Sequence, residues 1–167
     1  AGKSTLSLHA LADGMQLLSE DSAFVAVDNL LVTGAPNYLH VRTNGLRSLP
    51  DGELRRQIHR SPTIRRRSGV RKYEVALRRV SGQIATRPLR LAATVFLSRE
   101  PKGRQPPLRP LERNVFLARL RREQPYAVGL QNWCTFERRI VAVPAFELRR
   151  MEDPDDAVEE LKGVLAA

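Results

Sequence analysis

The chain has 167 residues, of which 42% are hydrophobic and 28% charged, so it is long enough to bury a core and has an ordinary globular composition. Its net charge of +10 and its isoelectric point of about 10.9 favour anionic partners such as ATP, an acidic protein surface or nucleic acid. The single cysteine excludes an internal disulfide framework and fits a reducing cytoplasm, and no apolar stretch of the sequence is long enough to span a bilayer.

The first five residues, Ala1-Gly2-Lys3-Ser4-Thr5, predict a phosphate-binding loop. Gly-Lys-Ser at the start of a helix is the second half of the P-loop pattern G-x-x-x-x-G-K-[ST]. Gly2 would let the backbone approach a phosphate, Lys3 would reach the β- and γ-phosphates, and the Ser4 hydroxyl would bind Mg²⁺. Since the first Gly of the pattern would precede Ala1, we expect the chain to be part of a longer protein. The alternative is an ordinary helix start with Ser4 as N-cap.

The first third of the chain predicts one helix followed by short strands. The helix runs from Ser4 to about Ala12 and ends at Asp13-Gly14, where Gly14 is placed to adopt a left-handed conformation. Strands are predicted at 15–18, at 24–27 and 30–32 as a hairpin around Asp28-Asn29, and at 38–41, with one or two helical turns over 44–49.

Residues 50–72 have a different composition, with seven arginines and few apolar residues. This pattern predicts a long, mobile basic loop that contains at most a short helix. The loop either contacts an anionic ligand or is simply a solvated surface.

The second half of the chain predicts alternating strands and helices. Strands are expected at 73–77, 89–97 (a central strand) and 141–148, and residues 101–110 form a Pro-rich surface loop. Helices are expected at 111–123, ended by Pro125, over the less regular stretch 126–140, and after the N-cap Asp153, where the last helix buries Val158, Leu161 and Leu165. The order predicts an α/β fold in which one mixed sheet is flanked by helices in a single domain over 1–167.

The acidic pair Glu20-Asp21 follows the predicted strand 15–18. Ligands bind outside the carboxyl ends of strands in open α/β sheets, so this position places two carboxylates beside the phosphates held by Lys3. Asp21 would hold Mg²⁺, and Glu20 would accept a proton from an attacking hydroxyl. The alternative is a solvated acidic turn between two strands.

Four segments of the chain together resemble the C-terminal catalytic domain of HPr kinase/phosphorylase and its HPr-kinase-like relatives. They are A-G-K-S-T-L-S-L-H-A-L-A-D-G-M-Q-L-L-S-E-D at 1–21, G-A-P-N-Y-L-H-V-R-T-N-G-L-R-S-L at 34–49, R-K-Y-E-V at 71–75 and P-L-R-L-A-A-T-V-F-L at 88–97, followed by V-P-A-F-E-L-R at 143–149. The resemblance implies a P-loop-containing core similar to that of phosphoenolpyruvate carboxykinase. Glu20 stands where many members have Asp, and the chain has no Glu-x-x-Gly-x-Gly segment, which disfavours HPr itself as substrate.

The resemblance also implies roles for individual residues. Ala1, Gly2, Lys3, Ser4 and Thr5 would bind the phosphates of ATP, with Ser4 and Asp21 on Mg²⁺. Lys3, Glu20 and Asp21 would be the catalytic residues, with Glu20 as base or orienter. Arg71 and Lys72 would neutralise the transferring phosphoryl group.

The function expected from these features is Mg-ATP-dependent phosphoryl transfer to a Ser hydroxyl of a protein or peptide in the cytoplasm. The rivals are an ATP-binding protein without kinase activity and a basic nucleic-acid-binding module. The latter is disfavoured because no aromatic residue interleaves with the Arg cluster before Tyr73. No membrane partner is expected, and a homo-oligomer stays open.

Cys134 and the three histidines are expected to be structural. Cys134 lies in an apolar neighbourhood, which is typical of a buried thiol. His9, His40 and His59 are not at metal-ligand spacing in the sequence, so ordinary structural roles are expected for them.

Overall fold

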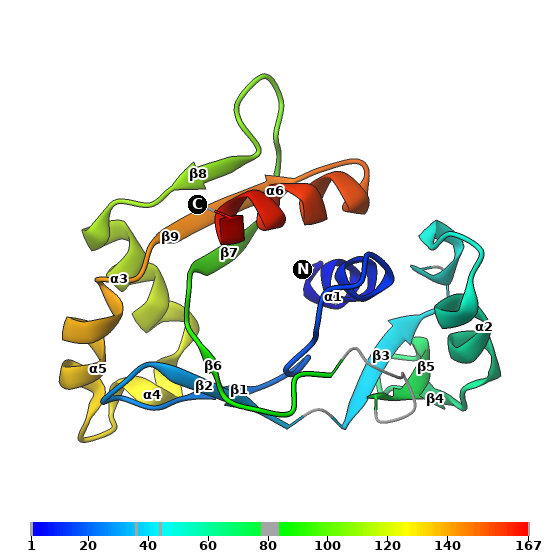
Figure 1. Ribbon diagram of the computed structural model, residues 1–167, viewed down its shortest axis with the longest axis horizontal. Coiled ribbons are helices and arrows are strands. Elements are labelled where there is room, and N and C mark those ends of the chain that lie inside the picture. The colour runs from blue at the N-terminus through cyan, green and yellow to red at the C-terminus, as the bar shows by residue number, and fades with distance from the viewer. Residues whose placement is uncertain (1, 36, 44, 78–83, 167) are drawn as a thin grey trace. The chain divides into compact units, whose positions relative to one another are not determined.

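The computed structural model describes residues 2–35, 37–43, 45–77 and 84–166 (Figure 1). The chain divides into two compact units, each described below by itself. The N-terminal unit comprises Gly2–Ala23 and Thr33–Arg87, and the C-terminal unit comprises Phe24–Val32 together with the chain from Pro88 onward. The described residues form an α/β structure with three small three-stranded sheets and six α-helices. Three small sheets replace the single mixed sheet that we expected.

The N-terminal unit is built on an antiparallel sheet with strand order β3-β5-β4. Its strands are β3 (Tyr38–Arg42), β4 (Thr63–Arg65) and β5 (Arg71–Ala76). Because side chains alternate along a strand, Leu39, Val41 and Val75 share one face and are buried against helix α1. Helix α1 (Lys3–Ala12) is followed by Gly14 with a positive φ of 91°, so this prediction is confirmed.

Residues 50–72 are not the long loop that we predicted. They contain helix α2 (Glu53–Arg60), strand β4 and the first part of the β4–β5 hairpin. Ile58 of α2 is fully buried and packs in one cluster with Leu46, which belongs to the short 3₁₀ helix η1 (Gly45–Ser48), and with Leu49, which directly follows that helix. The prediction failed because the abundance of arginine concealed Leu54 and Ile58, which are four residues apart on one helix face.

The predicted strand at 15–18 is also wrong. This segment makes a single parallel bridge, between Leu17 and Ile84, and is otherwise irregular. The acidic pair therefore follows a loop and not the end of a sheet strand.

The C-terminal unit contains a parallel pair of strands joined by a helical crossover, as parallel neighbours require. Strand β7 (Thr94–Pro101) pairs parallel with β9 (Ala145–Arg150), and β8 (Leu108–Pro110) pairs antiparallel with β9. The central strand of this sheet is thus β9, whereas the predicted strand 89–97 is divided into β6 (Leu89–Arg90) and the start of β7. The expected hairpin is confirmed as β1 (Ala23–Val25) and β2 (Leu31–Gly34), and β2 continues the ladder to β6.

Four helices complete this unit, α3 (Arg113–Glu123), α4 (Pro125–Val128), α5 (Trp133–Ile140) and α6 (Pro154–Ala166). The Asp153 carboxylate accepts a hydrogen bond from the Asp155 N–H at 2.9 Å, which confirms the predicted cap. Val158 is buried as expected, but Leu165 is exposed. Cys134 is also exposed, so its prediction as a buried thiol is wrong: helix α5 turns its neighbour Trp133 inward and Cys134 outward.

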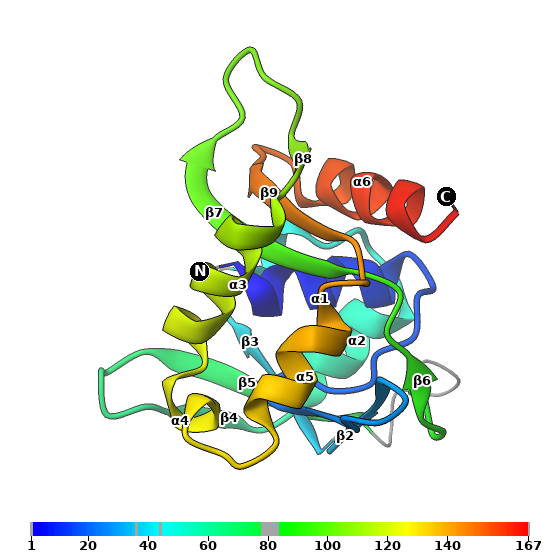
Figure 2. The ribbon, with the colours of Figure 1, turned by 90° about the vertical axis from the view of Figure 1, so that its left-hand side faces the viewer.

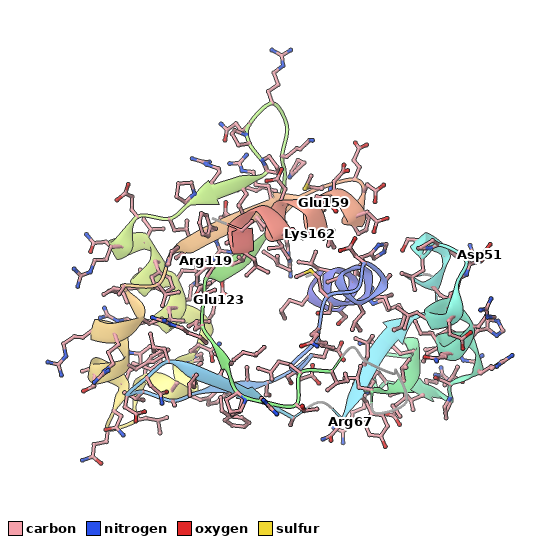
Figure 3. All side chains as sticks on the ribbon, in the orientation of Figure 1. Asp51, Arg67, Arg119, Glu123, Glu159 and Lys162 are labelled. Atoms are coloured by element: carbon pink, nitrogen blue, oxygen red, sulfur yellow. The ribbon has the colours of Figure 1, made fainter. Side chains whose placement is uncertain are left out.

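Charged side chains connect the helices of the C-terminal unit to its sheet and to one another. Arg119, drawn with Glu123 in Figure 3, binds that carboxylate, the Glu147 carboxylate of β9 and the Leu97 carbonyl oxygen. Glu137 on α5 accepts hydrogen bonds from the Trp133 indole at 2.6 Å and from Arg121 of α3 at 2.6 and 2.7 Å. Within the described residues, no helix is long and apolar enough to cross a membrane.

Candidate phosphate and metal site

Helix α1 begins at a glycine in a left-handed backbone conformation. Gly2 is the N-cap residue, with φ 114°, a left-handed conformation that residues with a side chain rarely adopt. No side chain caps the helix, and its first turn contains no acidic residue. The alternative of Ser4 as the N-cap is therefore wrong. The first N–H groups of α1, together with the exposed Lys3, form a cationic helix end.

Glu20 is held at the open edge of strand β3. Its Oε2 accepts a hydrogen bond from the His40 backbone N–H at 2.9 Å, and its side chain is only 4% exposed. The Leu77 N–H donates to the Asn37 carbonyl oxygen, so these two residues form a hydrogen-bonded pair of the antiparallel ladder. Because the two kinds of pair alternate along the strands, His40 and Glu74 form a non-hydrogen-bonded pair. The His40 N–H consequently points away from β5, to the edge that Glu20 covers. Glu20 is thus not part of a solvated acidic turn.

The His40 ring lies between two carboxylates. Its Nδ1 is 3.4 Å from Glu20 Oε2, and its Nε2 is 3.4 Å from Glu74 Oε2 on β5. A neutral imidazole has one N–H, so it can donate to one carboxylate while its other nitrogen stays free to accept or to bind a metal. With the proton on Nε2 and facing Glu74, Nδ1 would be the ligand atom, an arrangement common at metal centres.

Asp21 completes a group of side chains that could hold a metal ion. One ligand atom from each of Glu20, Asp21 and His40 lies within 4.8 Å of the other two. Asp21 is exposed, whereas the other two side chains are largely buried, so an ion here would keep contact with solvent. Carboxylate oxygens suit Mg²⁺, and an imidazole extends the choice to Mn²⁺ and Zn²⁺.

The loop that carries the acidic pair is fixed by a close backbone approach. A Cβ built on Gly34 would lie 2.4 Å from the Leu18 carbonyl oxygen and 2.7 Å from the Ser19 Cβ. Only glycine allows the end of β2 to come this close to the loop at 18–21. Gly34 is thereby a positioning residue for Glu20 and Asp21.

Arg71 and Lys72 begin strand β5 and belong to opposite faces of its sheet. Lys72 shares a face with Glu74 and is paired with Arg42 across the ladder, while Arg71 shares the other face with Tyr73. Only Lys72 is therefore on the face that carries His40.

The structure brings together two of the predicted site residues and adds two. Glu20 and Asp21 are joined by His40 and Glu74, which the sequence spacing did not single out. Among the described residues, no hydrogen bond or ion pair links Lys3 or Ser4 to the acidic pair, and Ala1 lies outside those residues. The prediction of a structural role is confirmed for His9, which is buried and whose Nε2 is 3.1 Å from Ser48 Oγ. The His59 ring lies 6.1 Å from that of Tyr73, centroid to centroid, at a tilt of 34°.

Comparison with known proteins finds no family model, no curated protein and no solved structure that matches this chain. The resemblance to HPr-kinase-like domains therefore stays an expectation from the sequence motifs.

Proposed function

We propose that the chain is the nucleotide-binding part of a Mg-ATP-dependent phosphotransferase that acts on a Ser hydroxyl of a protein or peptide. One observation carries the proposal: a helix that begins with Gly2-Lys3-Ser4 and a group of three candidate metal ligands belong to the same compact unit. Neither feature alone points to phosphoryl transfer, because each also occurs without a ligand. A phosphate cradle and a divalent cation are the two parts that this chemistry needs.

The uncapped start of α1 supports phosphate binding. No side chain caps the first N–H groups of α1, and no acidic residue in the first turn would repel an anion, so these groups could donate to a phosphate oxygen. In the proposal, Lys3 neutralises charge on the phosphates and the Ser4 hydroxyl binds Mg²⁺.

The two carboxylates take different roles in this proposal. Asp21 is exposed and is the residue that would bind Mg²⁺ bridging the phosphates. Glu20 is largely buried and already accepts the His40 N–H, so we assign it the role of orienting His40 and the metal in preference to that of a base. The Ser acceptor rests on the resemblance to HPr-kinase-like domains.

The buried, hydrogen-bonded state of Glu20 also favours a second candidate, an ATP-binding protein without transfer activity. In that protein Glu20 would serve only to cover the edge of β3, and nothing would accept the proton of an attacking hydroxyl. ATP hydrolysis distinguishes the two, because a passive binder would retain ATP affinity without turnover.

Calorimetry of ATP binding with Mg²⁺ tests the proposal. Lys3→Ala should weaken binding by at least about tenfold, since it removes a charge-assisted contact to phosphate. Lys102→Ala is the matched control, because Lys102 is exposed in the C-terminal unit, and it should bind like the wild type. Asp21→Asn should leave binding of metal-free ATP intact but remove the gain from Mg²⁺. Equal affinity of wild type and Lys3→Ala for Mg-ATP would refute the phosphate site.

A further inference from the structure

The β4–β5 hairpin carries four exposed cations that have no acidic partner in the part of the chain that is described. These hairpin cations are Arg65, Arg66, Arg67 and Arg71. Figure 2 shows β4 and β5 as a two-stranded arm, at whose turn the Gly69 N–H donates to the Arg66 carbonyl oxygen at 2.8 Å.

The arginines of the neighbouring helix α2 differ from the hairpin cations. Arg55 binds Asp51 at 2.8 Å, and Arg56 binds Glu53 at 2.9 Å. Asp51, which is labelled in Figure 3, forms no ion pair with any of the hairpin cations among the described residues. Two of the three arginines of α2 are thus paired with carboxylates, Arg60 being the exception, whereas none of the hairpin cations is paired among the described residues.

Two of the hairpin cations face each other across the ladder. The Arg66 N–H donates to the Val70 carbonyl oxygen at 3.0 Å, which places Arg65 opposite Arg71 in a non-hydrogen-bonded pair. The two side chains of a non-hydrogen-bonded pair lie closer together than those of a hydrogen-bonded pair. Like charges directly opposite each other destabilise a sheet. An anion bound between the two guanidinium groups would remove this repulsion.

Strand β4 also has an open edge. It is the last strand in the order β3-β5-β4. Thr63 and Arg65 both belong to non-hydrogen-bonded pairs with β5, so their N–H and C=O groups point away from that strand. No other hydrogen bond to these groups is found among the described residues. Such an edge is a template for an additional strand.

We infer that the edge of β4 binds an extended acidic segment of another protein as an added strand. The backbone of that segment pairs with Thr63 and Arg65, and its Asp or Glu side chains bind the hairpin cations. Edge pairing of this kind is an established mode of peptide recognition. It selects a polypeptide over a nucleic acid, because only a polypeptide supplies alternating N–H and C=O groups. The inference does not depend on phosphoryl transfer.

The test is fluorescence anisotropy with two labelled ten-residue peptides of equal charge. One alternates Glu with Thr and can pair as a strand, whereas the other alternates Glu with Pro and lacks every second N–H donor. We expect the Glu-Thr peptide to bind at least about tenfold more tightly, since the edge contacts require backbone donors. Equal binding of the two peptides, or no binding of either, would overturn the inference.

Variants of the protein locate the contact. Arg65→Gln with Arg71→Gln should weaken binding of the Glu-Thr peptide by at least about tenfold. Arg104→Gln with Arg113→Gln removes the same charge from exposed sites of the C-terminal unit and should change it less than about twofold. Thr63→Pro keeps the charge but removes an outward N–H that β5 does not use. It should weaken binding of the Glu-Thr peptide while the circular dichroism of the protein stays unchanged.

The last ligand of the binding experiment is a single-stranded oligonucleotide with the same charge as the peptides. It should bind more weakly than the Glu-Thr peptide and be displaced by it. Tighter binding of the oligonucleotide, lost in the Arg65→Gln, Arg71→Gln variant, would assign the hairpin to nucleic acid and refute the peptide.

Discussion

Replacing Glu20 in two ways separates its structural contact from any role at a metal. Glu20→Ala removes the carboxylate that accepts the His40 N–H. The Glu20 side chain is only 4% exposed, so little water reaches this N–H to replace the lost acceptor. Leaving a covered N–H without a partner costs about 2 kcal/mol. Glu20→Gln keeps an oxygen that can accept from the same N–H, so its cost should stay below about 1 kcal/mol. Both variants lose the anionic oxygen that a divalent cation would bind.

Amide hydrogen exchange at His40 is the assay that sees this contact directly. A local loss of about 2 kcal/mol corresponds to about 30-fold faster exchange in Glu20→Ala, against a few-fold change in Glu20→Gln. Tryptophan fluorescence is unsuitable, because the single tryptophan, Trp133, lies in the C-terminal unit. Titration with Mn²⁺ then reports metal affinity, which should fall in both variants.

Two outcomes would refute this reasoning. Exchange at His40 that is as slow in Glu20→Ala as in the wild type would show that the hydrogen bond contributes nothing to the edge of β3. Unchanged metal affinity in the well-folded Glu20→Gln variant would remove Glu20 from the metal group and leave it a purely structural residue.

Three further predictions concern other parts of the chain. Gly34→Ala should destabilise the N-terminal unit by about 1–3 kcal/mol in urea unfolding followed by circular dichroism, since its Cβ meets backbone at 2.4 Å. Gly163→Ala is the control: it lies inside helix α6 with no heavy atom within 4 Å of the added Cβ, so it should not destabilise and should stabilise by up to about 1 kcal/mol. The hydrogen bonds from Arg121, and secondarily from Trp133, lower the pKa of Glu137 below its ordinary value of 4.5. The unfolded chain thus protonates the Glu137 carboxylate more readily than the folded protein does. The ion pair of Glu137 therefore stabilises the folded protein fully well above pH 4.5, and its contribution declines as the pH falls below that. Thermal unfolding followed by Trp133 fluorescence should show a smaller loss of stability between neutral and acidic pH in Glu137→Gln than in the wild type. Exposed Cys134 should react fully with a thiol reagent in the native protein, and protection until unfolding would contradict its placement.

Local signals in the sequence predicted the elements whose ends are set by neighbouring residues. Helix α1 with Gly14 and helix α6 with its Asp153 cap were predictable, because caps and turns depend on a few consecutive residues. For 50–72 a short helix was allowed but not placed, and strand β4 was not predicted, because composition was weighted above the spacing of Leu54 and Ile58. Strand 89–97 was predicted as central because it is apolar, but its place in the sheet depends on partners far along the chain.

In the candidate site, too, residues that are neighbours in the sequence were predicted and residues from distant strands were not. The Gly2-Lys3-Ser4 motif and the acidic pair are contiguous and visible in the sequence. His40 and Glu74 are 20 and 54 residues from Glu20, so no spacing rule joins them to it. Their alternation with the core residues Leu39, Val41 and Val75 would nevertheless have placed both on the face opposite the core.

The division of the chain into two units has a consequence for biosynthesis. The chain crosses between the units after residues 23, 32 and 87, so Phe24–Val32 belongs to a unit whose other residues begin only at Pro88. Everything that the N-terminal unit needs has been synthesised once Arg87 has left the ribosome, whereas the β1–β2 hairpin still lacks its partner strand β6. The N-terminal unit can therefore fold first while the hairpin keeps an unpaired strand edge, the feature that invites association between nascent chains. A gene fragment beginning at Pro88 would lack that hairpin, and so neither half of the chain can be exchanged as one uninterrupted module.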